Sequence, residues 1–142
     1  MANQIRVFLD TNILVYQFDH SAPAKQKRAM ELVGRSIREE SAVISSQVVQ
    51  EFMNVALNKF KRSLSTAELD AVMTDFLKPL CAHFPTPDFY DRALKLYAAN
   101  GTSFYDALIV QAALDLNCKL LYSEDLQDGR QIDSLTIKNP FI

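Results

Sequence analysis

The chain has 142 residues, of which 49% are hydrophobic, so we expect a single domain over residues 1–142 with a substantial core. No apolar run is long enough to cross a bilayer, and the first residues lack a signal-peptide layout, so we expect a cytoplasmic protein without membrane contact. The net charge of −2 does not indicate a nucleic-acid-binding protein, and any such function must depend on local basic clusters. Cys81 and Cys118 lack partners at zinc-site spacing and are expected to be buried, reduced thiols.

Short apolar segments alternate along the chain with longer amphipathic ones, which predicts strands alternating with helices. The predicted strands are residues 5–9, 42–45, 81–84, 119–122 and 135–138. The predicted helices are residues 23–38, 46–60, 65–78, 87–99 and 105–116. This alternation predicts an α/β fold in which helices cover a central, mostly parallel sheet.

Several helix limits are marked by capping residues. Ser65 and Glu68 have the spacing of a capping box, and Thr86 precedes a proline at a first helical position. Gly101 provides a left-handed helix ending. In the helix over 23–38, one face is predicted to be buried and carries Ala29, Met30, Val33 and Ile37.

Two aspartates directly follow predicted strands. Asp10 follows the first strand, and Asp125 closes the segment Ser123-Glu124-Asp125 after the fourth. The carboxyl ends of parallel strands are where ligand sites gather, so both are candidate site residues. The alternatives are that Asp10 caps the next helix and that Asp125 belongs to a turn, with Glu124 or Asp128 as the site acid.

Two further acids lie on predicted helices. Asp106 precedes an apolar helix face, where an unpaired carboxylate is costly to bury, although it could instead complete a capping box with Ser103. Glu51 shares its side of a helix with Gln47 and Asn54 and has no basic residue at salt-bridge spacing. It is either a free carboxylate in a cleft wall or an ordinary surface residue.

Four acids from separate segments match the chemistry of phosphodiester hydrolysis. Carboxylate oxygens are the ligands that Mg²⁺ and Mn²⁺ prefer, and such ions activate water and stabilise a departing oxyanion. The chain has no glycine-rich phosphate loop, no zinc-site pattern and no serine-hydrolase motif. Phosphate contacts are expected from the cluster Lys59, Lys61 and Arg62, which could equally be an ordinary solvated segment.

The sequence resembles the PIN-domain family, and within it the VapC-type toxins of prokaryotic toxin–antitoxin pairs. The resemblance extends from Ile5 to the last strand. It rests on Asp10-Thr11-Asn12 after the first strand, Glu51 on a central helix, Ser103-Phe104-Tyr105-Asp106-Ala107-Leu108-Ile109 and Leu120-Leu121-Tyr122-Ser123-Glu124-Asp125.

The resemblance implies a three-layer α/β/α sandwich and a metal-dependent ribonuclease. Asp10, Glu51, Asp106 and Asp125 match the family's acidic positions, which are both catalytic and metal-binding, with Mg²⁺ or Mn²⁺ as the cofactor. Thr11 and Ser123 match supporting hydroxyl residues beside the metal, and Glu124 should point away. The implied partners are an RNA substrate, a second copy of the chain, and an antitoxin whose C-terminal segment occupies the active-site groove.

Two other functions remain open from the sequence. One is a PIN-like RNA- or protein-binding module that has lost activity. The other is a Mg²⁺-dependent phosphatase of the haloacid-dehalogenase class. Members of that class carry an Asp-x-Asp motif at the first strand, whereas this chain has Asn12 where the second aspartate belongs.

Overall fold

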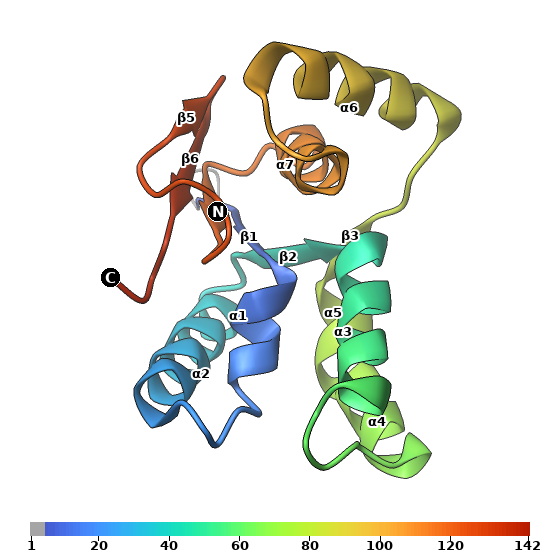
Figure 1. Ribbon diagram of the computed structural model, residues 1–142, viewed down its shortest axis with the longest axis vertical. Coiled ribbons are helices and arrows are strands. Elements are labelled where there is room, and N and C mark those ends of the chain that lie inside the picture. The colour runs from blue at the N-terminus through green and yellow to red at the C-terminus, as the bar shows by residue number, and fades with distance from the viewer. Residues whose placement is uncertain (1–4) are drawn as a thin grey trace.

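The computed structural model describes residues 5–142 and contains a six-stranded sheet (Figure 1). The strands are β1 (Val7–Leu9), β2 (Ala42–Ser45), β3 (Cys81–His83), β4 (Leu120–Tyr122), β5 (Gln131–Ile132) and β6 (Leu135–Lys138). Their order is β3-β2-β1-β4-β6-β5, and all neighbours are parallel except β5 and β6. The predicted mostly parallel sheet is confirmed, with β5 as an additional strand.

Helices cover both faces of this sheet. They are α1 (Thr11–Tyr16), α2 (Pro23–Arg38), α3 (Ser46–Asn58), α4 (Thr66–Val72), α5 (Lys78–Leu80), α6 (Pro87–Asn100) and α7 (Phe104–Asp115), with the π-helical segment η1 (Met73–Leu77) between α4 and α5. In Figure 1, α6 and α7 lie on one side of the sheet and α1 and α2 on the other, which gives the predicted three-layer sandwich. Within residues 5–142, every helix is too short or too polar to cross a membrane.

The predicted capping signals form as expected. The Ser65 and Glu68 side chains each accept a hydrogen bond from the other residue's backbone N–H, both at 3.1 Å. The Thr86 hydroxyl accepts from the Phe89 N–H, and Gly101 has a φ of 69°. The predicted helix over 65–78 is divided by η1, and this wider turn lies just before Pro79, which has no N–H to donate.

The predicted buried face of α2 is wrong at two positions. Ala29 and Val33 are buried, but Met30 is 54% exposed and Ile37 is 37% exposed. Leu32 is fully buried in their place. The face that packs on α1 and β2 therefore contains Ala29, Leu32 and Val33, which have the spacing i, i+3, i+4. The apolar residues of this helix are compatible with more than one such face.

The centre of the sheet determines where the candidate site lies. Strands β1 and β4 are adjacent and in register, with Leu9 paired to Tyr122 at their carboxyl ends. Asp10 and Ser123, the next residue in each strand's continuation, therefore emerge side by side. The two cysteines are free, as predicted, although Cys81 is only half-buried.

Helix α3, which carries Glu51, is held by an aromatic contact. Phe52 is 1% exposed, and its ring centroid lies 5.7 Å from that of Phe18 and 6.5 Å from that of Phe60. We expect Phe52→Ala to lower the free energy of unfolding by about 3–5 kcal/mol, because it leaves a cavity between α1, α3 and the following loop. Urea unfolding followed by circular dichroism measures this loss.

The control is Leu57→Ala on the exposed side of the same helix, which should change stability by about 0.5 kcal/mol or less. Equal effects of the two substitutions would contradict the packing described for α3.

Candidate active site

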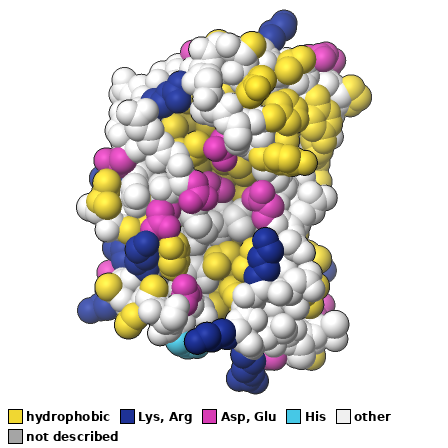
Figure 2. Space-filling view, in the orientation of Figure 1, with side chains coloured by type: hydrophobic (Ala, Val, Ile, Leu, Met, Phe, Trp, Pro, Cys, Tyr) yellow, Lys and Arg dark blue, Asp and Glu magenta, His cyan; other side chains and the backbone are white. Residues whose placement is uncertain are grey.

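The four acids predicted as a cluster line one open cleft of about 440 Å³. Asp10 follows β1, Glu51 lies on α3, Asp106 is in the first turn of α7, and Asp125 follows β4. Figure 2 shows acidic side chains gathered in the hollowed centre of this face, with basic side chains below them and hydrophobic ones towards α6. The fold thus brings together four carboxylates from separate parts of the chain.

Asp10 is the most buried of the four and is held by two neutral donors. Its side chain is almost enclosed, at 6% exposure. Oδ1 accepts a hydrogen bond from the Thr11 N–H at 2.7 Å, and Oδ2 accepts one from the fully buried Ser123 hydroxyl, also at 2.7 Å. Asp10 therefore caps α1, as one alternative proposed, and also lines the cleft.

This environment disfavours the charged form of Asp10. Burial is the largest cause and raises the pKa of this carboxyl from 3.8 to about 6, while the hydrogen bonds from Ser123 and Thr11 oppose the shift. Repulsion by the Glu51 and Asp125 carboxylates adds to it. Asp10 thus lies where a nearby cation would be favourable.

Glu51 faces the cleft among amide and hydroxyl groups. The Thr11 hydroxyl donates to Oε1 at 2.6 Å, and the Gln47 amide approaches Oε2 at 3.4 Å. Asn54 also lines the cleft, as the amide-rich helix face predicted. Within residues 5–142, no Lys, Arg or His forms an ion pair with any of the four acids.

Asp106 has a free carboxylate within the described part of the chain. Its backbone N–H donates to the Ser103 hydroxyl at 3.1 Å, so Ser103 caps α7. The reciprocal bond of a capping box, from the Ser103 N–H to the Asp106 carboxylate, is absent among residues 5–142. The side chain is half-buried and lines the cleft instead.

Asp125 is positioned by a turn and by Asn12. The Ser123 hydroxyl accepts a hydrogen bond from the Asp125 N–H at 3.2 Å, and the Asn12 amide donates to the Asp125 carboxylate at 3.1 Å. Asn12 also accepts a bond from the Glu124 N–H. No site role was predicted for Asn12, because the residues that it contacts lie more than 100 positions away in the chain.

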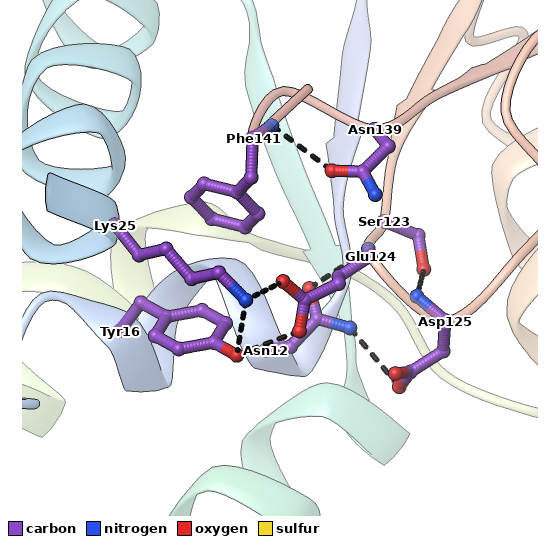
Figure 3. Close-up of polar contacts among 8 residues, drawn as sticks. All are labelled: Asn12, Tyr16, Lys25, Ser123, Glu124, Asp125, Asn139 and Phe141. Atoms are coloured by element: carbon purple, nitrogen blue, oxygen red, sulfur yellow. Dashed lines mark hydrogen bonds and ion pairs between the residues drawn. The ribbon is translucent and has the colours of Figure 1, made fainter. Parts of the chain in front are cut away.

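The two competing acids near the fourth position have other partners. Figure 3 shows the Glu124 carboxylate turned towards Tyr16 and Lys25, each of which donates to it at 2.6 Å. Asp128 accepts a hydrogen bond from the Asn139 N–H at 2.8 Å and does not line the cleft. Glu124 therefore points away, as expected, and the geometry favours Asp125 as the fourth cleft acid.

Of the three basic residues predicted to contact phosphate, Lys59 lines the cleft. Lys61 and Arg62 are exposed in the segment that follows α3, outside the cleft lining. They extend the basic surface next to Lys59.

The chemistry of the cleft fits a hard divalent cation, although the acids are not drawn into a tight cluster. Among the residues described, no three Asp, Glu, His or Cys side chains form a ready-made metal-binding group. The available donors are carboxylate oxygens, which Mg²⁺ and Mn²⁺ prefer, and they lack basic partners within residues 5–142. Asp10, Glu51, Asp106 and Asp125 are the residues that could hold such an ion.

The fold and the cleft define an α/β protein with an acidic site at the carboxyl ends of parallel strands. The chain belongs to the PIN-domain family, whose profile matches residues 7–130. No curated protein sequence matches the chain significantly.

Several solved structures share this fold. A chain of a toxin–antitoxin complex from Klebsiella pneumoniae aligns with a TM-score of 0.66 and 19% identity, covering 94% of this chain and 97% of its own. A chain of FitAcB from Neisseria gonorrhoeae aligns with a TM-score of 0.65 and 17% identity, covering 95% of this chain and 98% of its own. A chain of VapBC2 from Rickettsia felis, bound to a promoter DNA fragment, aligns with a TM-score of 0.57 and 19% identity, covering 95% of this chain and 98% of its own. At these identities the similarity establishes the fold alone.

We expect Asp10→Asn to stabilise the metal-free protein above about pH 6 and to have little effect near pH 4. The folded-state pKa of about 6 exceeds the unfolded value of 3.8, so the folded protein retains a proton that the unfolded chain releases. The free energy of unfolding therefore falls by roughly 1–3 kcal/mol as pH rises from about 4 to about 6. Asparagine has the shape of aspartate but carries no charge, so the variant avoids this loss.

Urea unfolding of both proteins in a chelator, at several pH values from 4 to about 8, measures the difference. It should grow between about pH 4 and 6 and then level off. Parallel pH profiles of the two proteins would show that burial does not destabilise the Asp10 carboxylate.

Proposed function

We propose that this protein is a divalent-metal-dependent endoribonuclease and the toxin of a prokaryotic toxin–antitoxin pair. The observation that carries the proposal is the acidic cleft, in which four carboxylates from separate segments meet without basic partners among residues 5–142. Membership of the PIN-domain family supports hydrolysis of phosphodiester bonds.

In this proposal Asp10, Glu51, Asp106 and Asp125 hold Mg²⁺ or Mn²⁺. When bound, the ion supplies an activated water and stabilises negative charge on the phosphate and the departing oxygen. Asp10 is the best fixed of the four acids, because its two oxygens have separate neutral donors that orient it without cancelling its charge.

The remaining side chains orient the acids and attract the substrate. The Thr11 hydroxyl fixes one oxygen of Glu51, and Ser123 links Asp10 to the turn that carries Asp125. Lys59, at the edge of the cleft, is placed to contact a phosphate, and Lys61 and Arg62 would attract the RNA beyond it.

An antitoxin partner is supported by the similar structures, of which one is described as a toxin–antitoxin complex. The resemblance places the C-terminal segment of an antitoxin in the active-site groove, and a basic side chain of that segment would be complementary in charge to the acidic cleft. A homodimer completes the proposal on the basis of the same resemblance, and the cytoplasmic location expected from the sequence stays a prediction. The family assignment does not favour the phosphatase alternative.

We expect Asp106→Asn to lower RNA cleavage by more than about 100-fold, because losing even an indirect contributor to a metal site typically costs 10- to 100-fold. Cleavage of labelled single-stranded and structured RNA by the purified, antitoxin-free protein in Mg²⁺ or Mn²⁺ measures the effect.

Asp128→Asn is the matched control, since it makes the same aspartate-to-asparagine change at a residue that lies outside the cleft lining. It should cleave RNA at nearly the normal rate. Cleavage that survives Asp106→Asn unchanged would remove the assignment, and no cleavage of any RNA by the unmodified protein would favour the binding module.

A second expectation is that Mn²⁺ raises the melting temperature of the unmodified protein, because a divalent cation relieves repulsion among the cleft carboxylates. Asp10→Asn should reduce this rise. Thermal melts across a Mn²⁺ titration measure both effects, with Asp128→Asn again as the control. An identical response of Asp10→Asn and the unmodified protein would show that the cleft is not the metal site.

A further inference from the structure

A second pocket, of about 290 Å³, opens beside the acidic cleft. Gln47 and Tyr105 line both spaces, so the two are adjacent. Its volume is at the lower end of the range for small-molecule sites, which suits one planar ring system better than a helix or strand of a partner. Tyr105 is also the chain neighbour of Asp106, so this pocket begins directly beside a cleft acid.

The walls of this pocket are largely aromatic. Phe104 and Tyr105 form one wall, with ring centroids 6.4 Å apart. Phe89 and Tyr90 contribute to another, at 5.5 Å. Tyr105 is 69% exposed, which leaves most of a large, amphipathic ring uncovered beside the cleft.

Polar side chains with unused hydrogen-bonding groups also line the pocket. Within residues 5–142, the side chains of Ser46 and Gln50 make no hydrogen bond, and the side-chain oxygen Oε1 of Gln47 accepts none. The Gln47 amide donates to the Tyr105 carbonyl at 3.3 Å and so fixes the boundary between pocket and cleft. Amide and hydroxyl groups of this kind recognise the polar edges of nucleobases.

The Phe89 wall of the pocket is supported by His83, which also lines the pocket, and by the Arg92–Asp115 ion pair beyond it. His83 lies on the edge strand β3 and is buried against Phe89, with ring centroids 4.5 Å apart. Its Nε2 lies 3.5 Å from the Asp115 carboxylate, which is also held by Arg92. The aromatic wall is therefore supported by more than its own packing.

We infer that this pocket binds one unpaired nucleobase of the RNA, next to the phosphate in the acidic cleft, with the base stacked on Tyr105. The inference rests on the proposed ribonuclease function and adds a determinant of where the RNA is cut. A second copy of the chain is the other conceivable occupant, because Leu94 and Tyr97 leave an apolar surface exposed on α6. The concave shape, the free polar groups and the position next to the cleft favour the base.

The test is the kinetics of cleavage of a single-stranded RNA and of versions with an abasic nucleotide at each position in turn. In the unmodified protein, one abasic position beside the cleaved bond should lower kcat/KM by about 5- to 100-fold, the usual range for loss of one base–aromatic stack. Tyr105→Ala should lower kcat/KM for the intact RNA to a similar extent. The same abasic position should then lower kcat/KM of Tyr105→Ala almost no further. Tyr105→Phe, which keeps the aromatic ring, should recover most of the kcat/KM that Tyr105→Ala loses and should again lose rate at the abasic position.

Tyr97→Ala is the matched control, because Tyr97 is an exposed tyrosine that contacts Phe104 but lines neither the pocket nor the cleft. Its kinetics should be unchanged. If the unmodified protein cleaves RNA and Tyr105→Ala cleaves it equally well, or still loses rate at the abasic position, the inference is overturned and the proposed function stands. If the unmodified protein cleaves no RNA, both are overturned.

Light scattering on each variant measures its molar mass and so distinguishes a nucleobase from a second copy of the chain as the occupant of the pocket. Unchanged molar mass in Tyr105→Ala, with reduced kcat/KM, supports the base. A lower molar mass in both Tyr105→Ala and Tyr97→Ala, with parallel loss of activity, would assign the surface to a second copy and overturn the inference.

Discussion

The burial of the Asp10 carboxylate at the end of the central strand is the constraint on which the rest of the site depends. The Asp10 N–H donates to the Tyr122 carbonyl at 3.0 Å, so the hydrogen bonding between β1 and β4 continues to this residue. A carboxylate held there must find donors nearby, and they come from Ser123 on the neighbouring strand and from the start of α1. The strand pairing and the first helix are thereby joined at one side chain.

Neutral donors and basic side chains divide the acids of this region into two groups. The cleft acids Asp10 and Glu51 receive hydrogen bonds from hydroxyl, amide and backbone groups, which orient a carboxylate but leave its charge available. Glu124 is one residue from Asp125 in the chain, yet it is neutralised by Lys25. Adjacent acids thus have opposite electrostatic roles, and the difference lies in the partner supplied by a distant helix.

The positions of the cleft acids could be predicted from the sequence, but the partners of their neighbours could not. The positions of Asp10 and Asp125 follow from local rules, because each comes after an apolar strand and parallel strands end at the same edge. The partner of Glu124 could not be predicted, because it depends on how α2 packs, and the buried face of α2 was itself misassigned at Met30 and Ile37. The strand β5 has only two residues, too few for a hydrophobic alternation to be visible.

The packing of α3 against the start of α7 gives Tyr105 a position that no local sequence pattern predicted. Tyr105 is noticeable in the sequence only as a neighbour of Asp106, and its role as a boundary depends on a hydrogen bond from Gln47 on another helix. Side chains of this kind are predictable only after the helices have been placed, because their function depends on which surfaces meet rather than on spacing within one element.

The charge of the cleft finally bears on how a net acidic protein could hold RNA. Four carboxyl groups line the cleft without basic partners among residues 5–142, and Asp10, whose pKa is raised to about 6, is still mostly ionised at neutral pH. Such a cleft repels phosphate, and Lys59 alone offsets little of that repulsion. In the proposed mechanism a bound divalent cation would therefore have two effects, because it would supply the chemistry and would also offset part of the negative charge that the RNA meets. Stacking in the neighbouring aromatic pocket would contribute affinity that does not depend on this offset, which is a physical reason for placing a base-binding surface beside an acidic site.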